Sequence, residues 1–125
     1  MIQTTNVVND DNPSYGIDGG NNTQDKVFLL SIDEVNQYFA DDEDRMCVPT
    51  DYAVEEGVYT SNSNTVGGAA TCWWWLRSPG YFGDCAAHVF DDGGVSSSGG
   101  VYYGGRYVDD DSDAVRPALW INLAS

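Results

Sequence analysis

The last third of the chain carries side chains suited to non-covalent recognition. Between residues 81 and 111, tyrosines and phenylalanines accompany six aspartates and one arginine, with serines and glycines between them. Tyrosine supplies a large, rigid contact area with one polar tip, while serine, glycine and aspartate supply adaptable hydrogen bonds. This mixture predicts a binding surface with aromatic anchors, suited to a basic or mixed protein epitope. The anchors are Tyr81, Phe82, Tyr102, Tyr103 and Tyr107, and the arginine is Arg106.

Residue types that serve in catalysis are few. His88 is the single histidine, and no arrangement of serine, histidine and acid can be placed around it. Cys47, Cys72 and Cys85 are odd in number and lack CxxC spacing, which argues against a zinc site and a full disulfide framework. They are either plain thiols or include a single bridge. We therefore expect no enzymatic activity, no catalytic residue and no cofactor.

Three aspartates resemble the start of a calcium-binding loop. Asp109, Asp111 and Asp113 have the alternate spacing of an EF-hand, but its sixth and twelfth positions hold Ala114 and Trp120 in place of glycine and glutamate. Neither a Glu-Pro-Asn nor a Trp-Asn-Asp triplet occurs. No metal-binding residue is predicted, and calcium-dependent carbohydrate binding is kept as an alternative function.

Length and charge narrow the class of protein. The 125 residues suit one domain, and the net charge of −15 leaves no basic footprint for nucleic acid. The compact apolar runs, Val27 to Leu30 and Cys72 to Leu76, are strand-sized, so no membrane span is expected. The N-terminal residues do not read as a signal peptide.

Local patterns predict the elements that position the candidate residues. Residues 1–25 read as loop with one short strand around Val7, and Val27 to Leu30 reads as a buried strand. Ser31 and Glu34 form a capping box ahead of a helix over residues 32–39. A second helix is expected over residues 51–56, with Thr50 as its cap and Gly57 as its end, and residues 60–71 read as loop.

Valines recur in the C-terminal part of the chain at positions 89, 95, 101, 108 and 115, with glycine pairs at 93–94, 99–100 and 104–105. This pattern predicts short strands joined by tight turns, each strand placing one valine inward. The units match too poorly for a β-helix. A final strand is expected after residue 115, with Leu119, Ile121 and Leu123 on one face. The four tryptophans are expected in the core or a half-buried sheet: Trp73, Trp74, Trp75 and Trp120.

Residues 81–115 also have an unusual composition. Lys, Gln, Glu, Met and Trp are absent there, although they fill 13 of the first 80 positions. These five are the residues that codons ending in a pyrimidine do not encode, and Asn is missing as well. Turn-rich β segments prefer small residues and tyrosine in any case, so composition alone leaves both explanations open.

Four motifs resemble those of a known family: residues 25–35, residues 49–53, the run WWWLRSPG at residues 73–80, and the run VRPALWIN at residues 115–122. They are similar to C-type-lectin-like domains of gut Firmicutes and their phages. Some members of that family are variable proteins of diversity-generating retroelements, in which mutagenesis of template adenines turns Asn codons into any codon ending in a pyrimidine. The template asparagines would correspond to Tyr81, Phe82, Asp84, His88, Phe90, Tyr102, Tyr103 and Asp109.

The resemblance implies an α+β, C-type-lectin-like fold, with two short helices packed on a small twisted antiparallel sheet with long loops. Residues 1–25 would be a loop-rich N-terminal segment, 26–80 the scaffold, 81–114 the variable region and 115–125 the C-terminal strand. The implied function is recognition of a macromolecular ligand, a protein or a glycan, on another cell or a phage. The candidate ligand-binding residues are Tyr81, Phe82, Gly83, Asp84, Cys85, His88, Phe90, Asp91, Ser96, Ser97, Tyr102, Tyr103, Arg106, Tyr107, Asp109, Asp110 and Asp111.

Some of these residues carry a second interpretation. Phe90 directly follows Val89 and is as well explained by a place in the core. Arg77 and Arg116 flank the variable stretch and are expected to hold the frame through carboxylates or carbonyls. The fold is also similar to that of formylglycine-generating enzymes, which work through cysteines, so a cysteine-dependent enzyme is a further alternative.

Overall fold

The computed structural model describes residues 1–96 and 106–123, and the side chain of Ser96 is not included. Over these residues the protein is a small α+β fold with three short helices, two separate hairpins and one larger antiparallel sheet. Among the candidate ligand-binding residues, Ser97, Tyr102 and Tyr103 lie outside the described residues, as does Val101 of the valine series.

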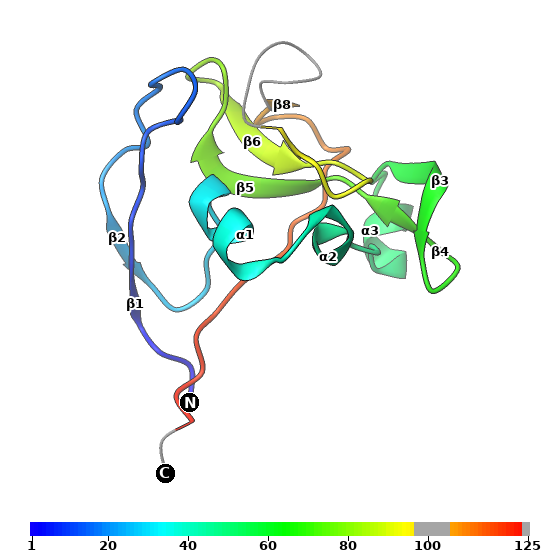
Figure 1. Cartoon of the computed structure of the whole chain (residues 1–125), viewed down its shortest axis with the longest axis horizontal. Coiled ribbons are helices and arrows are strands. Elements are labelled where there is room, and N and C mark those ends of the chain that lie inside the picture. The colour runs from blue at the N-terminus through cyan, green and yellow to red at the C-terminus, as the bar shows by residue number, and fades with distance from the viewer. Residues whose placement is uncertain (97–105, 124–125) are drawn as a thin grey trace.

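The larger sheet forms the centre of the molecule (Figure 1). Its strands are β5 (Trp74–Pro79), β6 (Cys85–Val89), β7 (Val95–Ser96) and β8 (Arg106–Tyr107), and β6 pairs with all three others. Side chains of β5 alternate between buried and half-buried, so Trp74 and Leu76 enter the core with Val35 of the first helix and Val89 of β6. Burial of these apolar side chains is the main contribution to the stability of the fold.

Two predicted helices are confirmed. Helix α1 (Ile32–Tyr38) begins with the expected capping box, in which Ser31 accepts from the backbone N–H of Glu34 and the Glu34 side chain accepts from that of Ser31. Helix α3 (Asp51–Glu55) begins at Thr50, whose side chain accepts from the N–H of Ala53. The sequence signals of both helices are local, because each cap side chain bonds to a backbone N–H only three residues further along the chain.

A third helix was not predicted. Helix α2 (Asp42–Arg45) is one turn within the acidic run, capped by the side chain of Asp41. Arg45 fixes its position, donating through Nε to the carbonyl of Gly93 at 2.8 Å and pairing with Asp42. Gly93 has a φ of +83°, and an ideal Cβ there would lie 1.7 Å from the carbonyl oxygen of Asp42. The helix therefore packs directly on the β6–β7 turn, where only glycine fits.

The prediction of a loop over residues 60–71 is wrong. Strands β3 (Thr60–Val66) and β4 (Ala69–Cys72) form an antiparallel hairpin. Gly67 and Gly68 connect them with φ values of 59° and 83°, as a two-residue hairpin turn requires. Strand β3 is polar and mostly exposed, and β4 has only four residues, of which Thr71 and Cys72 are buried. Neither strand therefore gives the apolar alternation by which a half-buried strand is recognised.

The N-terminal segment contributes a second hairpin. Strand β1 (Thr5–Val7) confirms the expected strand around Val7 and pairs with β2 (Thr23–Asp25). The buried strand expected at Val27 to Leu30 is not formed, because Val27 is exposed and only Phe28 makes a bridge, to Ala118.

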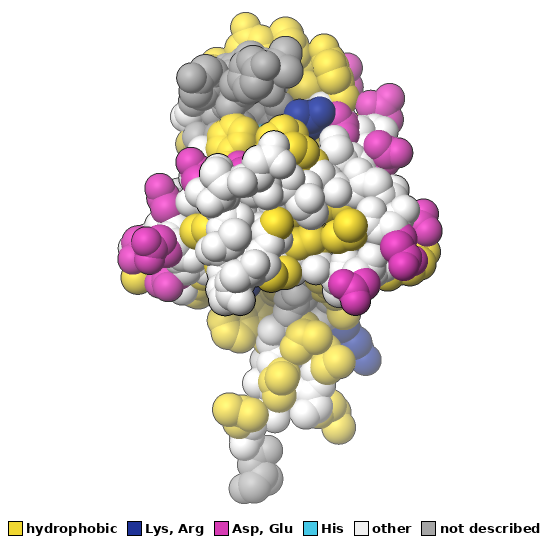
Figure 2. Space-filling model, turned by 90° about the vertical axis from the view of Figure 1, so that its right-hand side faces the viewer, with side chains coloured by type: hydrophobic (Ala, Val, Ile, Leu, Met, Phe, Trp, Pro, Cys, Tyr) yellow, Lys and Arg dark blue, Asp and Glu magenta, His cyan; other side chains and the backbone are white. Residues whose placement is uncertain are grey.

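The two ends of the chain lie side by side, in a segment that we call the stem and define as residues 1–3 with 118–123. Ile2 bridges Ile121, and the N–H of Gln3 donates to the carbonyl of Trp120 at 2.9 Å. The expected final strand is reduced to such isolated bridges, and the side chains expected to share one of its faces, Leu119, Ile121 and Leu123, are exposed. Figure 2 shows hydrophobic side chains along the stem and acidic ones over the body of the molecule.

Valines and tryptophans divide between core and surface. Val89 and Trp74 are fully buried and Val95 is half-buried, as expected, while Trp73 and Trp75 are half-buried in the sheet. The prediction is wrong for Val108 and Val115, which are 63% and 67% exposed, and for Trp120, which is 43% exposed. These three residues lie beyond the strands that pair with β6, so no sheet neighbour covers them. In the part of the chain that the structure describes, no helix has the length and apolar character to cross a bilayer.

Candidate ligand-binding surface

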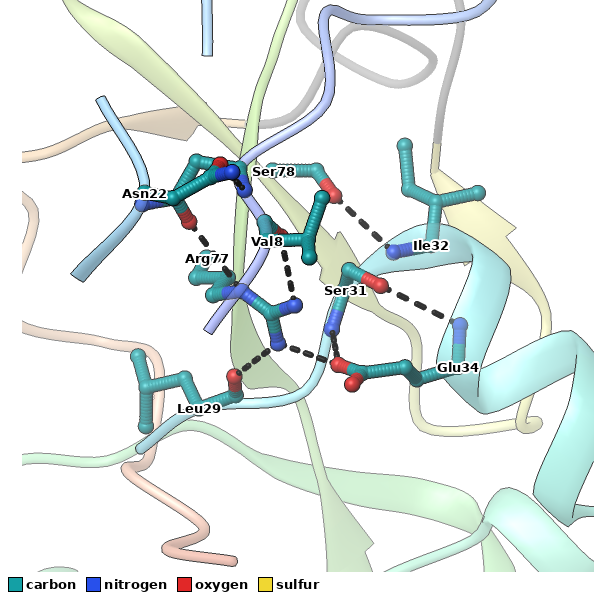
Figure 3. Close-up of polar contacts among 9 residues, drawn as sticks. Val8, Asn22, Leu29, Ser31, Ile32, Glu34, Arg77 and Ser78 are labelled. Atoms are coloured by element: carbon teal, nitrogen blue, oxygen red, sulfur yellow. Dashed lines mark hydrogen bonds and ion pairs between the residues drawn. The ribbon is translucent and has the colours of Figure 1, made fainter. Parts of the chain in front are cut away.

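Arg77 of β5 joins the N-terminal segment, the residues before α1 and α1 itself (Figure 3). Its guanidinium donates to the carbonyls of Leu29 and Val8 at 2.7 and 2.8 Å and to Oδ1 of Asn9 at 3.1 Å. It also forms an ion pair with Glu34, with both side chains mostly buried. Burial opposes the charge of Glu34, but the hydrogen bond from Arg77 and the backbone of Ser31 hold the pKa of that carboxyl below its usual range. The expectation that Arg77 holds the frame is confirmed.

Arg116 has a similar role on the other side of the frame. Its guanidinium lies over the rings of Trp74 and Phe39, 4.8 and 5.2 Å from their centroids, and donates to the carbonyl of Arg45 at 3.5 Å. Such stacking on aromatic rings is a strength of arginine. Arg116 therefore stabilises the core around Trp74 by stacking, which was not predicted, while the carbonyl of Arg45 is a partner of the expected kind.

Pairing along β6 brings the two halves of the predicted surface together. Cys85 and Ala86 lie opposite Tyr107 and Arg106, and the N–H of Val108 donates to the carbonyl of Asp84 at 3.0 Å. The β5–β6 loop, residues 80–84, and the segment at residues 106–111 consequently share one end of the sheet.

The exposed side chains of these two segments form the candidate surface. Phe82 and Tyr107 are 52% and 56% exposed, and Gly83 is exposed beside Phe82. Tyr81 is half-buried, packing edge-to-face on Phe82 with ring centroids 4.2 Å apart and on Tyr15 at 4.5 Å. We define the candidate surface by its aromatic and acidic members, namely Tyr15, Tyr81, Phe82, Asp84, Tyr107, Asp109 and Asp111.

Tyr15 is the member that sequence reasoning missed. It lies in the N-terminal loop, and Asn12 holds that loop by donating through its side chain to the carbonyl of Pro79 at 2.9 Å and accepting from the N–H of Tyr15. The turn chemistry around Pro13 predicted a loop but carried no signal that the loop would return to β5.

Two of the predicted aspartates and the arginine are engaged within the protein. Arg106 lies 4.9 Å from the ring centroid of Trp73 and pairs with Asp110. Hydrogen bonds from Ser112, with help from Arg106, lower the pKa of Asp110 to about 2. Asp91 accepts from Nε1 of Trp73 at 3.1 Å and from the side chain of Asn64 at 3.1 Å. Burial opposes the charge of Asp91, but these hydrogen bonds and one from Ser61 keep its pKa below the usual range.

Two of the candidate ligand-binding residues, His88 and Cys85, are buried in the structure. His88 is 1% exposed, and its Nδ1 lies 2.7 Å from Oδ2 of Asp113. Cys85 is 9% exposed. Both residues belong to β6, the central strand of the sheet, so neighbouring strands and rings keep them from a ligand at the surface. Phe90, at the end of β6, is half-buried against Trp73 and the His88 ring, which favours its interpretation as part of the core.

The aspartates with EF-hand-like spacing separate in the structure. Asp109 and Asp111 are exposed, whereas Asp113 is buried against His88. Within residues 1–96 and 106–123, no three His, Cys, Asp or Glu side chains form a group able to hold a metal ion.

Comparison with known proteins places the chain in a family. No curated protein and no solved structure matched it. Its residues 1–123 match the family described as "Domain of unknown function (DUF6273)". Because this match covers nearly the whole chain, the protein is a member of the DUF6273 family.

Proposed function

We propose that this protein recognises a macromolecular ligand through the candidate surface, and that its fold is a C-type-lectin-like one. The observation that carries the proposal is a separation of roles among polar and aromatic side chains. Arg77, Arg116 and Asp91 each make several contacts inside the frame. Phe82 and Tyr107 instead leave more than half of their area in water. Exposed aromatic groups on a rigid frame are typical of binding surfaces.

The same separation supports diversification by a retroelement. Asp84, Asp109 and Phe82 correspond to template asparagines in the resemblance and are exposed, so exchanging them removes little buried contact. His88 is buried and Phe90 is half-buried against Trp73, and there exchange has a structural cost. The proposal therefore assigns the variable role to the two surface segments and not to β6.

The chemistry of the surface indicates the class of ligand. Asp84, Asp109 and Asp111 are exposed beside the aromatic side chains, and the whole chain has a net charge of −15. Acidic groups around aromatic anchors favour a ligand that presents lysine or arginine next to an apolar contact. A protein epitope of basic or mixed character fits this description better than a neutral glycan.

The proposal is tested with a displayed library of random peptides, selected for binding to the purified protein. Enrichment of peptides with Lys or Arg beside an apolar residue is expected, and it should be lost in the double variant Phe82→Ser, Tyr107→Ser. The matched control is Tyr52→Ser, which removes a 70% exposed tyrosine from α3. Enrichment that survives the double variant, or that Tyr52→Ser abolishes equally, would refute the assignment of the surface.

The retroelement is tested on the DNA beside the gene. We expect a near-copy of the segment encoding residues 81–114, differing at adenines of the copy, next to a reverse transcriptase gene. Diversification would be contradicted if the differences were scattered over all bases, or if no differences occurred at codons 82, 84 and 109. Either result would leave the ligand-binding proposal standing, because the peptide experiment tests it separately.

A further inference from the structure

Two cysteines from distant parts of the chain lie opposite each other. Cys47 is in the connection between α2 and α3, and Cys72 is the last residue of β4. They form an isolated antiparallel bridge, in which the N–H of Cys72 donates to the carbonyl of Cys47 at 2.8 Å. In the structure both residues are free thiols.

The geometry of this bridge suits a disulfide. Directly opposed, hydrogen-bonded residues of an antiparallel pair have Cα atoms about 5.5 Å apart. That separation lies within the range of about 4.4 to 6.8 Å that disulfides span. Directly opposed residues of an antiparallel pair place their side chains on the same face, with Cβ atoms about 4.5 to 5.5 Å apart, so the two thiols are neighbours. A bond between the two sulfurs therefore needs little movement of the backbone.

The two thiols differ in a way that suits sequential reaction. Cys72 is fully buried, whereas Cys47 is half-buried. The hydrogen bond from Cys72 lowers the pKa of Cys47 to about 6, although burial opposes this, and the nearby Arg116 guanidinium contributes to the lowering. The same hydrogen bond and burial raise the pKa of Cys72. Cys47 is consequently the more acidic and more accessible thiol of the pair, and Cys72 is the buried partner behind it.

Cys85 provides an internal contrast. It is buried, and burial raises the pKa of its thiol. It lies in β6, opposite Tyr107 and not opposite another cysteine. Cys85 therefore has neither the partner nor the thiolate character of Cys47.

We propose that Cys47 and Cys72 are a redox couple that closes reversibly into a disulfide by exchange with a small disulfide such as oxidised glutathione. The Cys47 thiolate attacks one glutathione sulfur, forming a mixed disulfide and releasing one glutathione thiolate. Cys72 gives up its proton to the released thiolate, attacks Sγ of Cys47 and expels the second glutathione thiolate, which takes a proton from water. The pair loses two electrons, and oxidised glutathione gains them as two thiols.

Closing this bond would fasten the α2–α3 connection to β4. The bond encloses α3 and strand β3, which lie between the two cysteines in the sequence. Restricting that segment in the unfolded chain is expected to raise the melting temperature by about 5 to 15 °C.

The experiment exposes the purified protein to an excess of oxidised glutathione near neutral pH, followed by alkylation of free thiols. Combined cleavage after arginine and glutamate separates residues 46–55, with Cys47, from residues 57–77, with Cys72, and leaves Cys85 in a third fragment. We expect the first two fragments to be joined, with the loss of two hydrogen atoms in the intact mass and one alkylated cysteine, Cys85. The higher melting temperature should return to its starting value on reduction.

Two variants test the order of events. Cys72→Ser should stop at a glutathione adduct on Cys47, while Cys85→Ser should form the same linked fragments as the natural chain. Three alkylated cysteines after oxidation, or a linkage that includes Cys85, would overturn the proposal. Because the linked fragments are measured in the natural chain, this outcome does not depend on how well any variant folds.

Discussion

At the scale of residues, Arg77 shows how one side chain can hold three segments. Its partners are the carbonyls of Val8 and Leu29 and the carboxylate of Glu34, and the Arg77 and Glu34 side chains are both mostly buried. The sequence predicted a carboxylate or carbonyl partner for Arg77, because this arginine flanks the variable stretch and was expected to hold the frame. It did not identify these partners, because they lie more than 40 residues away along the chain.

Replacing Arg77 should therefore destabilise the protein strongly. Arg77→Met leaves Glu34 without its cation and two carbonyls without their donor, and we expect a loss of about 3 to 5 kcal/mol in the free energy of unfolding. Lys26→Met is the control, since Lys26 is exposed and should change stability by less than about 0.5 kcal/mol. Urea denaturation measures both, and equal effects would contradict the role of Arg77.

The carboxyl group of Asp110 should make the stability of the protein depend on pH. Its pKa falls from 3.8 to about 2 in the folded protein, mainly through Ser112. A lowered folded-state pKa means that the stabilisation is present above about pH 4 and is lost as the pH falls toward 2. Asp110→Asn should lower the urea midpoint at about pH 6 and narrow its gap to the natural protein at about pH 2.5. Asp111→Asn, at an exposed neighbour, is the control, and a constant gap for Asp110→Asn would contradict the assignment.

At the scale of elements, helices and strands were predicted correctly where the interactions that fix them join residues close together in the sequence. Helices α1 and α3 were predicted because their caps are local. The β3–β4 hairpin was missed because β3 is polar and mostly exposed, so that its backbone pairing with the short strand β4 leaves no apolar pattern in the sequence. Helix α2 also has a local cap, Asp41, but it is only one turn long and its position depends on Arg45 reaching the β6–β7 turn at Gly93.

The packing of α2 on that turn leads to a sharp prediction. Gly93→Ala places a methyl group against the backbone of Asp42 at a positive φ, so we expect a loss of about 1 to 3 kcal/mol, or more if α2 detaches. Gly83→Ala is the matched control, because no atom lies within 4 Å of its Cβ position and its φ is not positive. Melting temperatures decide between them, and a harmless Gly93→Ala would mean that α2 is not packed as described.

At the scale of the molecule, the net charge affects the stability of the protein. The chain of 125 residues has a net charge of −15, so its acidic side chains repel one another. Composition alone was sufficient to predict this repulsion. The course of the chain was not predictable in the same way, because bridges such as Ile2 with Ile121 join residues from its two ends.

Salt should consequently stabilise the protein. Screening over about 10 Å at 0.1 M salt weakens repulsion between surface carboxylates and affects the buried Arg77–Glu34 pair much less. We expect the free energy of unfolding to rise by roughly 1 kcal/mol between low and moderate sodium chloride concentrations. Thermal unfolding at several salt concentrations measures this, and a melting temperature that falls with salt would contradict it.

The stem determines how the protein can be attached to something else. The N–H of Asn122 donates to the carbonyl of Met1 at 2.9 Å, so both ends leave the molecule at one pole, while the β5–β6 loop and β8 lie at the opposite pole (Figure 1). A tag, a bead or a sensor chip coupled at either end would therefore leave Phe82 and Tyr107 facing outward.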